Sequence, residues 1–98
     1  MTPAEFNLCV SASAQPPPGL SAALRALWWM AKGEWEQAHT VAQGDSSAAG
    51  SWVHAHLHRV EGDEGNAGYW YARAGRPPAS GALEVEREAI VAALLGRT

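Results

Sequence analysis

The chain has 98 residues, the length of about one small domain, so a two-domain enzyme is excluded. Hydrophobic residues make up 47% of the chain and charged residues 17%, against about 25% charged in a typical soluble domain. This composition predicts a packed globule rather than a disordered chain. The net charge is −3 and there is no basic run, which argues against nucleic-acid binding and against an anionic membrane surface.

The cysteine content and the first residues bear on the compartment. Cys9 is the single cysteine and cannot form an internal disulfide, whereas small secreted domains usually carry several cysteines. The residues after Met1 show neither the basic stretch nor the long apolar segment of a signal peptide or membrane anchor. We therefore expect a cytoplasmic protein.

The first eighteen residues differ from the rest of the chain. A short apolar stretch at 6–10 is followed by three consecutive prolines at 16–18, which cannot donate backbone hydrogen bonds. Proline runs favour extended conformations. The sequence therefore predicts that residues 1–18 form an extended arm along a helical body.

From Leu20 onward, apolar residues recur at spacings of three and four, which is the period of an α-helix. The pattern predicts a helical hairpin at 20–43, a second hairpin at 47–75 and a C-terminal helix at 83–95. Gly33 and Gly62 separate the helices within each hairpin, and Asp63 is the expected N-cap of the helix that follows. The expected fold is all-α, with four or five short antiparallel helices, the last of which caps the open apolar end.

The two predicted hairpins are related by an internal repeat. Three landmarks recur with an offset of 29 residues: Ala26 and Ala55, Gly33 and Gly62, Ala38 and Ala67. In the second unit, this glycine and alanine spacing, with Tyr71 and then prolines, resembles the tetratricopeptide (TPR) repeat. The resemblance covers about residues 20–78 and implies a TPR-like stack of α-hairpins, although Ala42 stands in the first unit where Tyr71 stands in the second.

A second resemblance lies in residues 52–63, which read W-V-H-A-H-L-H-R-V-E-G-D, and in 66–71, which read N-A-G-Y-W-Y. They resemble a family of small uncharacterised bacterial and fungal helical proteins. The hallmark of that family is W-V-H-A-x-L-H-R-x-E-G-D followed by N-A-x-Y-W-Y. The resemblance implies that this segment is a functional unit and implies no particular chemistry.

Three polar residues of this segment are candidates for catalysis or metal binding. At helical spacing His54, His58 and Glu61 share one face, and His39 is a candidate fourth group from the preceding hairpin. Histidines at i and i+4 with a carboxylate one turn later can hold a metal ion, but the stronger H-E-x-x-H motif is absent. We therefore expect a polar pocket shared with His39 or Asn66, in which the histidines form hydrogen bonds, and no tightly bound metal or cofactor.

The opposite face of the same helix presents Trp52, His56 and Arg59. In a TPR-like arrangement these residues would line a concave binding surface, where an aromatic ring and a guanidinium can anchor a carboxylate or an aromatic group. The alternative is that Trp52 packs under the C-terminal helix or the N-terminal arm and Arg59 pairs with Asp63 at i+4.

The helix predicted after Asp63 carries further candidates. Asn66, Tyr69 and Trp70 are the polar and aromatic groups nearest the histidine segment, although such rings are more often part of a core. Gly65, Gly68 and Ala72 form a stripe of small residues, a face against which another chain segment, a ligand or a second copy could press. Together with the high tryptophan content, this stripe favours a homodimer.

These observations leave three classes of function open. The leading hypothesis is a binding or interaction module with an aromatic, histidine and arginine pocket, whose ligand is a peptide, a protein or a small molecule. The second is a small hydrolytic or isomerising enzyme in which His54 or His58 is the general base and Glu61 orients it, with or without a metal. The third is a structural subunit of a larger assembly.

Overall fold

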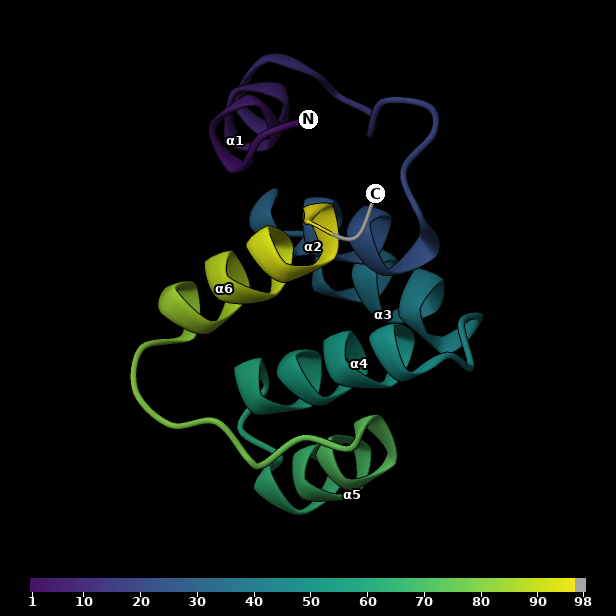
Figure 1. The fold of residues 1–98 in the computed structure, drawn as a ribbon, viewed down its shortest axis with the longest axis vertical. Helices are drawn as coiled ribbons and strands as arrows, with labels where there is room; N and C mark the ends of the chain where they lie inside the picture. The colour runs from purple at the N-terminus through teal and green to yellow at the C-terminus, as the bar shows by residue number, and fades with distance from the viewer. Residues whose placement is uncertain (97–98) are drawn as a thin grey trace.

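The computed structural model describes residues 1–96, and all regular secondary structure in that part of the chain is helical (Figure 1). The all-α prediction is therefore confirmed, with six helices in place of the expected four or five. They are α1 (Pro3–Ala12), α2 (Ala22–Ala31), α3 (Trp35–Gln43), α4 (Ala48–Val60), α5 (Glu64–Ala74) and α6 (Leu83–Leu95). None of these helices is both long and apolar enough to traverse a bilayer.

Helix α1 corrects the prediction of an extended arm at 1–18. Thr2 and Glu5 form a capping box, in which the Glu5 backbone N–H donates to the Thr2 hydroxyl at 3.1 Å and the Thr2 N–H donates to the Glu5 carboxylate at 2.8 Å. Pro3 lies in the first turn, where its missing N–H has no intrahelical partner to lose. The proline run affects only the non-helical connection at 13–21.

Helix α1 is held in place at both ends. Phe6 is 1% exposed and belongs to the core that it shares with α2 and α6. The Lys32 ammonium donates hydrogen bonds to the carbonyl oxygens of Val10 and Ser13, both at 2.6 Å, and so places a cation where the last carbonyls of α1 have no helical partner.

The two hairpins, α2–α3 and α4–α5, have matching turns. Gly33 and Gly62 have φ values of 90° and 85°, a left-handed conformation that glycine adopts without strain. In both turns the glycine N–H donates to the carbonyl three residues earlier, and the next N–H donates to the carbonyl five residues earlier. The repeated alanines, which allow close helix approach, are at most 1% exposed: Ala26, Ala38, Ala55 and Ala67.

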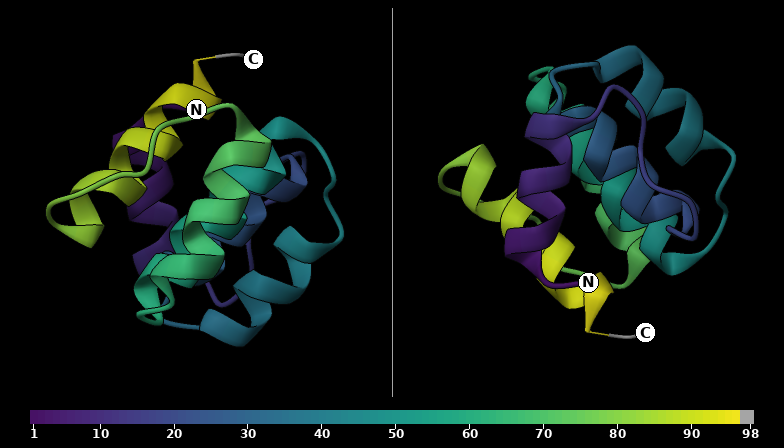
Figure 2. Two further views of the ribbon diagram at one scale, coloured as in Figure 1. Left: turned by 90° about the horizontal axis from the view of Figure 1, so that it is seen from below. Right: turned by 90° about the horizontal axis from the view of Figure 1, so that it is seen from above.

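Helix α4 is the centre of the molecule. It packs against α2, α3, α5 and α6, and all six residues from 53 to 58 are buried (Figures 1 and 2). Helix α6 contacts α2 and α1 as well, and α1 lies at the end of the molecule opposite α5. The largest fully buried apolar and aromatic side chains are Trp28, Tyr71, Phe6, Leu27, Leu57, Ile90 and Val53.

The stripe of small residues on α5 has no neighbour within residues 1–96. A methyl group at Gly68 would meet no atom within 4 Å, and one at Gly65 would meet only the Asp63 carboxylate, at 3.9 Å. No other segment of the described chain therefore requires these glycines, and the homodimer stays a prediction.

The capping box predicts a measurable loss on substitution of Thr2. Thr2→Ala removes the side-chain acceptor for the Glu5 N–H and should lower the free energy of unfolding by about 1 kcal/mol. For a domain of this size that corresponds to a fall in Tm of roughly 4 to 8 °C in a thermal melt followed by circular dichroism. Thr40→Ala, at an exposed position inside α3, is the matched control and should leave Tm unchanged or slightly raised. Equal melting curves for wild type and Thr2→Ala would contradict the capping role.

Candidate functional site

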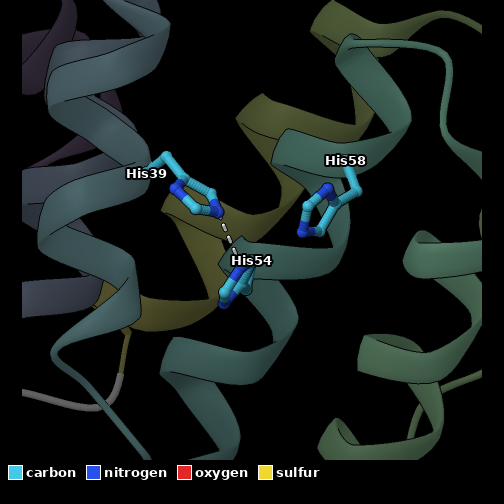
Figure 3. A group of neighbouring side chains, drawn as sticks. All are labelled: His39, His54 and His58. Atoms are coloured by element: carbon cyan, nitrogen blue, oxygen red, sulfur yellow. Dashed lines mark hydrogen bonds between the residues drawn. The ribbon is translucent and has the colours of Figure 1, made fainter.

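Three histidines from two helices converge on one point between α3 and α4 (Figure 3). His39, His54 and His58 each offer a ring nitrogen, and these nitrogens all lie within 4.8 Å of one another. The Nε2 atoms of His39 and His54 are 3.0 Å apart and share a hydrogen bond. We call these three residues the histidine cluster.

The cluster follows from the helical register of α4 and from the packing of α3 against it. His54 and His58 are one turn apart, so their rings stack, with centroids 4.8 Å apart and planes 17° from parallel. His39 lies on α3, which packs directly against α4. His56 points to the opposite side of α4, so the predicted division of the three α4 histidines between two faces is confirmed.

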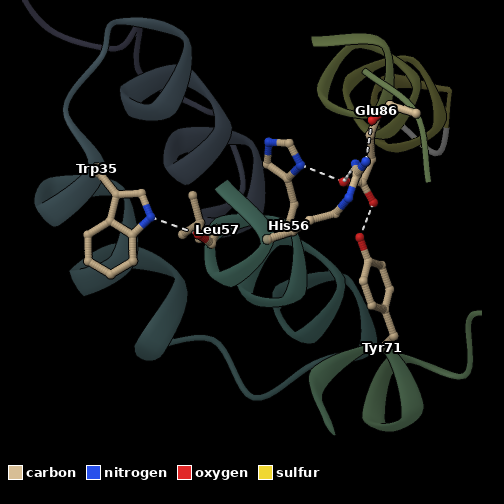
Figure 4. A network of polar contacts seen from close by, with 7 residues as sticks. Trp35, His56, Leu57, Tyr71 and Glu86 are labelled. Atoms are coloured by element: carbon tan, nitrogen blue, oxygen red, sulfur yellow. Dashed lines mark hydrogen bonds and ion pairs between the residues drawn. The ribbon is translucent and has the colours of Figure 1, made fainter. Parts of the chain in front are cut away.

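Two tryptophans hold the cluster from either side. Trp35 stacks on His39, with centroids 4.8 Å apart, and donates its indole N–H to the Leu57 carbonyl oxygen at 2.8 Å (Figure 4). Trp70, from α5, stacks on His54 with centroids 3.9 Å apart. Trp70 was predicted as a binding residue and Trp35 was not, although its i, i+4 spacing from His39 signals a shared face.

Glu61 completes the arrangement through His58. Its carboxylate Oε1 lies 2.6 Å from His58 Nδ1, so Nδ1 carries the proton and donates it. This contact fixes the tautomer of His58 and leaves the lone pair of Nε2 available to the cluster. Glu61 therefore orients His58, one of the two histidines for which the sequence predicts this contact.

The surroundings of His39 and His54 favour neutral imidazoles, because they lower the pKa of both side chains. Burial, and then the neighbouring His39 and His58, lower the pKa of His54 from 6.5 to about 4. Burial and the nearby His58 also lower the pKa of His39, despite the opposing effect of Glu61 and Glu36. Neutral imidazole nitrogens can act as hydrogen-bond acceptors or as metal ligands, whereas imidazolium nitrogens can do neither.

On the other face of α4, His56 and Arg59 meet the buried carboxylate of Glu86 from α6. Figure 4 shows His56, Tyr71 and Glu86 in this network. Glu86 Oε1 is 2.7 Å from His56 Nδ1 and 3.0 Å from an Arg59 guanidinium nitrogen, and Glu86 Oε2 accepts a hydrogen bond from the Tyr71 hydroxyl. Burial acts to raise the pKa of Glu86, but the hydrogen bonds from His56, Tyr71 and Arg59 outweigh it and lower that pKa. Burial and the same carboxylate raise the pKa of Tyr71.

This network corrects two expectations about Arg59. Arg59 pairs with Glu86 and not with Asp63, and a second guanidinium nitrogen donates to the Gly81 carbonyl oxygen. Its charge is therefore not available on an open concave surface. Sequence reasoning missed Glu86 because it lies 30 residues from His56 along the chain, with no local motif to connect them.

The remaining predicted site residues lie apart from the histidine cluster. Asn66 donates its side-chain amide to Asp63 at 2.8 Å and its backbone N–H to the same carboxylate, which makes Asp63 the N-cap of α5 as predicted. Tyr69 is 54% exposed and accepts a hydrogen bond from Arg73. Trp52 is half-buried on the other face of α4, beneath the Arg76 guanidinium. Of the two residues expected to lie beside His54 and His58, His39 does so and Asn66 does not.

No family model, no curated protein and no solved structure matches this chain. The functional argument therefore rests on the geometry and chemistry of its own residues.

The lowered histidine pKa values predict how stability depends on pH in the metal-free protein. Between pH 6.5 and about 4 the unfolded chain binds a proton at His54 that the folded chain does not, so stability is full above this range and falls through it. His39 acts in the same direction, and the charged or titratable groups facing the pair are His58, Glu61 and Glu36. Urea unfolding in EDTA should show a loss on the order of 2 kcal/mol between pH 7 and pH 4.5.

A substitution separates this effect from other titrations. His54→Gln keeps an amide near the position of the imidazole nitrogen and cannot titrate, so its stability should fall less over the same pH range. Glu86, whose pKa is lowered, contributes in both proteins and only in the acidic part of the range. Identical pH slopes for wild type and His54→Gln would contradict the assignment.

Proposed function

We propose that this chain is a small binding module whose ligand is a divalent transition-metal ion, held by His39, His54 and His58. The observation that carries the proposal is the convergence of three imidazole nitrogens within 4.8 Å of one another. Imidazole suits late first-row ions such as Zn²⁺, Cu²⁺ and Ni²⁺, and zinc most often takes tetrahedral coordination at about 2.0 to 2.1 Å from nitrogen.

The spacing within the cluster supports this ligand. Two nitrogens on one tetrahedral zinc ion are separated by about 3.3 Å, given the usual zinc–nitrogen bond length. The Nε2 atoms of His39 and His54 are already 3.0 Å apart. Binding would therefore exchange one imidazole hydrogen bond for two metal bonds with little movement of either helix.

The groups around the cluster also support a metal. Metal-binding histidines commonly donate their second ring N–H to a carboxylate, as His58 does to Glu61. The stacking of Trp35 and Trp70 fixes the planes of His39 and His54 and lowers the local dielectric. Neither feature is needed for a simple hydrogen bond between two helices.

A metal-assisted hydrolytic enzyme is the second candidate function, and the His58–Glu61 contact favours it. Three protein ligands leave a tetrahedral ion one position for water, which is the composition of many catalytic zinc sites. His54 has little support as a general base, because a histidine with a pKa of about 4 is a weak base at neutral pH. Glu61, moreover, contacts His58 and not His54.

Titration calorimetry with ZnCl₂ on protein freed of any histidine tag tests the proposal. We expect one zinc ion to bind per chain with release of heat. This heat should be absent when zinc is added to His39→Gln or to His58→Gln. At a free zinc concentration 100 times Kd, the ion should add about 2.7 kcal/mol to the free energy of unfolding. Glu61→Gln should bind zinc about 10 to 100 times more weakly, because the carboxylate that orients His58 is lost.

His56→Gln is the matched control, since it removes a histidine of the same helix that lies outside the cluster. It should bind zinc with the affinity of the wild type. Binding of zinc by His39→Gln and His58→Gln as tightly as by the control, or no binding by the wild type, would overturn the proposal.

A further inference from the structure

A pocket lies on the opposite side of α4 from the histidine cluster. It is a cavity of about 320 Å³ between α4, α5 and α6, partly roofed by the segment that joins α5 to α6. Its walls include Trp52, Tyr71, Arg76, Val85, Ala89 and Ile90. Pockets for small organic ligands begin at roughly this volume, and most have apolar walls with a few polar groups.

Arg76 is the charged group at this cavity whose side chain has no hydrogen-bond or ion-pair partner among residues 1–96. Its guanidinium carbon lies 3.5 Å from the centroid of the Trp52 ring, a stacked cation–π contact. Within residues 1–96 its side chain makes no hydrogen bond or ion pair, whereas Arg59 bonds to Glu86 and Arg73 bonds to Tyr69. Stacking holds the guanidinium in one plane and leaves its N–H edge able to pair with both oxygens of a carboxylate.

The charge balance of the cavity selects an anion with a single charge. Glu86 lines the cavity, but its oxygens already accept from His56, Arg59 and Tyr71, and the Arg59 charge compensates it. Arg76 is therefore the one uncompensated cation among the described lining residues. A phosphate or a dicarboxylate would bring a second negative charge towards Glu86 with no second cation to meet it.

The apolar walls select the rest of the ligand. Val85 is 66% exposed at the cavity, and the exposed Ala89 and the half-buried Trp52 ring continue the same surface. Covering these groups would release water from apolar area, which favours binding. The volume accommodates a body the size of one aromatic ring with a short chain.

We propose that this cavity binds a free small-molecule monocarboxylate with an apolar body, the carboxylate on Arg76 and the body against Trp52, Val85 and Ala89. The predicted anchor of an aromatic ring and a guanidinium is formed by Trp52 and Arg76, and not by Trp52 and Arg59. The proposal is independent of the metal site, since none of the histidine cluster lines this cavity.

An NMR titration of ¹⁵N-labelled protein with 3-phenylpropionate tests the proposal, and 3-phenylpropionamide is the uncharged control ligand. We expect shifts at the Trp52 indole N–H and at the Val85 amide, and binding of the acid at least about tenfold tighter than the amide. Equal affinities for acid and amide, or no shifts at millimolar acid, would overturn the proposal.

Two variants locate the two halves of the ligand. Arg76→Met keeps an apolar stem over Trp52 and removes the charge, so it should weaken acid binding about tenfold or more and abolish discrimination against the amide. Arg87→Met removes the same charge from α6 outside the cavity and should bind the acid as the wild type does. Ala89→Phe fills the cavity and should abolish binding of both ligands. Unchanged affinity in Arg76→Met or Ala89→Phe, with native spectra, would overturn the proposal.

A peptide carboxylate is the competing source of the same chemistry. Acetyl-Ala-Ala-Phe presents a phenyl group and a carboxylate on a peptide backbone and should bind no more tightly than 3-phenylpropionate. If the peptide bound tenfold more tightly and shifted residues beyond the cavity, the assignment to a free small molecule would be wrong.

Discussion

The burial of α4 on all sides is the constraint on which the rest of the structure depends, because it removes three imidazoles from water at once. A buried polar group without a partner costs about 1 to 3 kcal/mol, so neighbouring helices must supply partners. Helix α3 supplies His39 to His54, and α6 supplies Glu86 to His56. Glu61, at the end of α4 itself, holds His58. The polar residues of α4 thus pair with His39 of α3 and Glu86 of α6 where these two helices lie against it.

The same constraint produces two chemically different faces. On one face, aromatic rings from α3 and α5 cover His39 and His54, and burial lowers the pKa values of both side chains. Their imidazoles are therefore neutral, and their nitrogens can act as metal ligands. The other face gathers an ionised carboxylate, Arg59 and the stacked Arg76 beside an apolar cavity. A metal suits the first face and a carboxylate ligand suits the second. Since α4 forms a wall of both sites, a change in its position would reach both.

How much of this the sequence predicts depends on whether a feature is local. The bounds of α5 agree with prediction because Gly62, Asp63 and the prolines after Gly75 act on adjacent residues. The Thr2–Glu5 capping box is also a local signal, and it favours the helix at Pro3–Ala12. The prediction of an extended arm gave more weight to the proline run, which lies after this helix. The pairing of His56 and Arg59 with Glu86 could not be predicted from the sequence, because Glu86 is 27 to 30 residues away and only the packing of α6 brings it close.

The central claim is that three imidazoles form one metal site, and X-ray absorption at the zinc K-edge tests it most directly. Tag-free protein loaded with one equivalent of Zn²⁺ and dialysed should retain the ion. Its spectrum should show four light ligands at about 2.0 Å and the outer-shell scattering of three imidazole rings, and His39→Gln treated in the same way should not retain the ion. Loss of zinc on dialysis, or a spectrum of six oxygen ligands without imidazole scattering, would contradict the account.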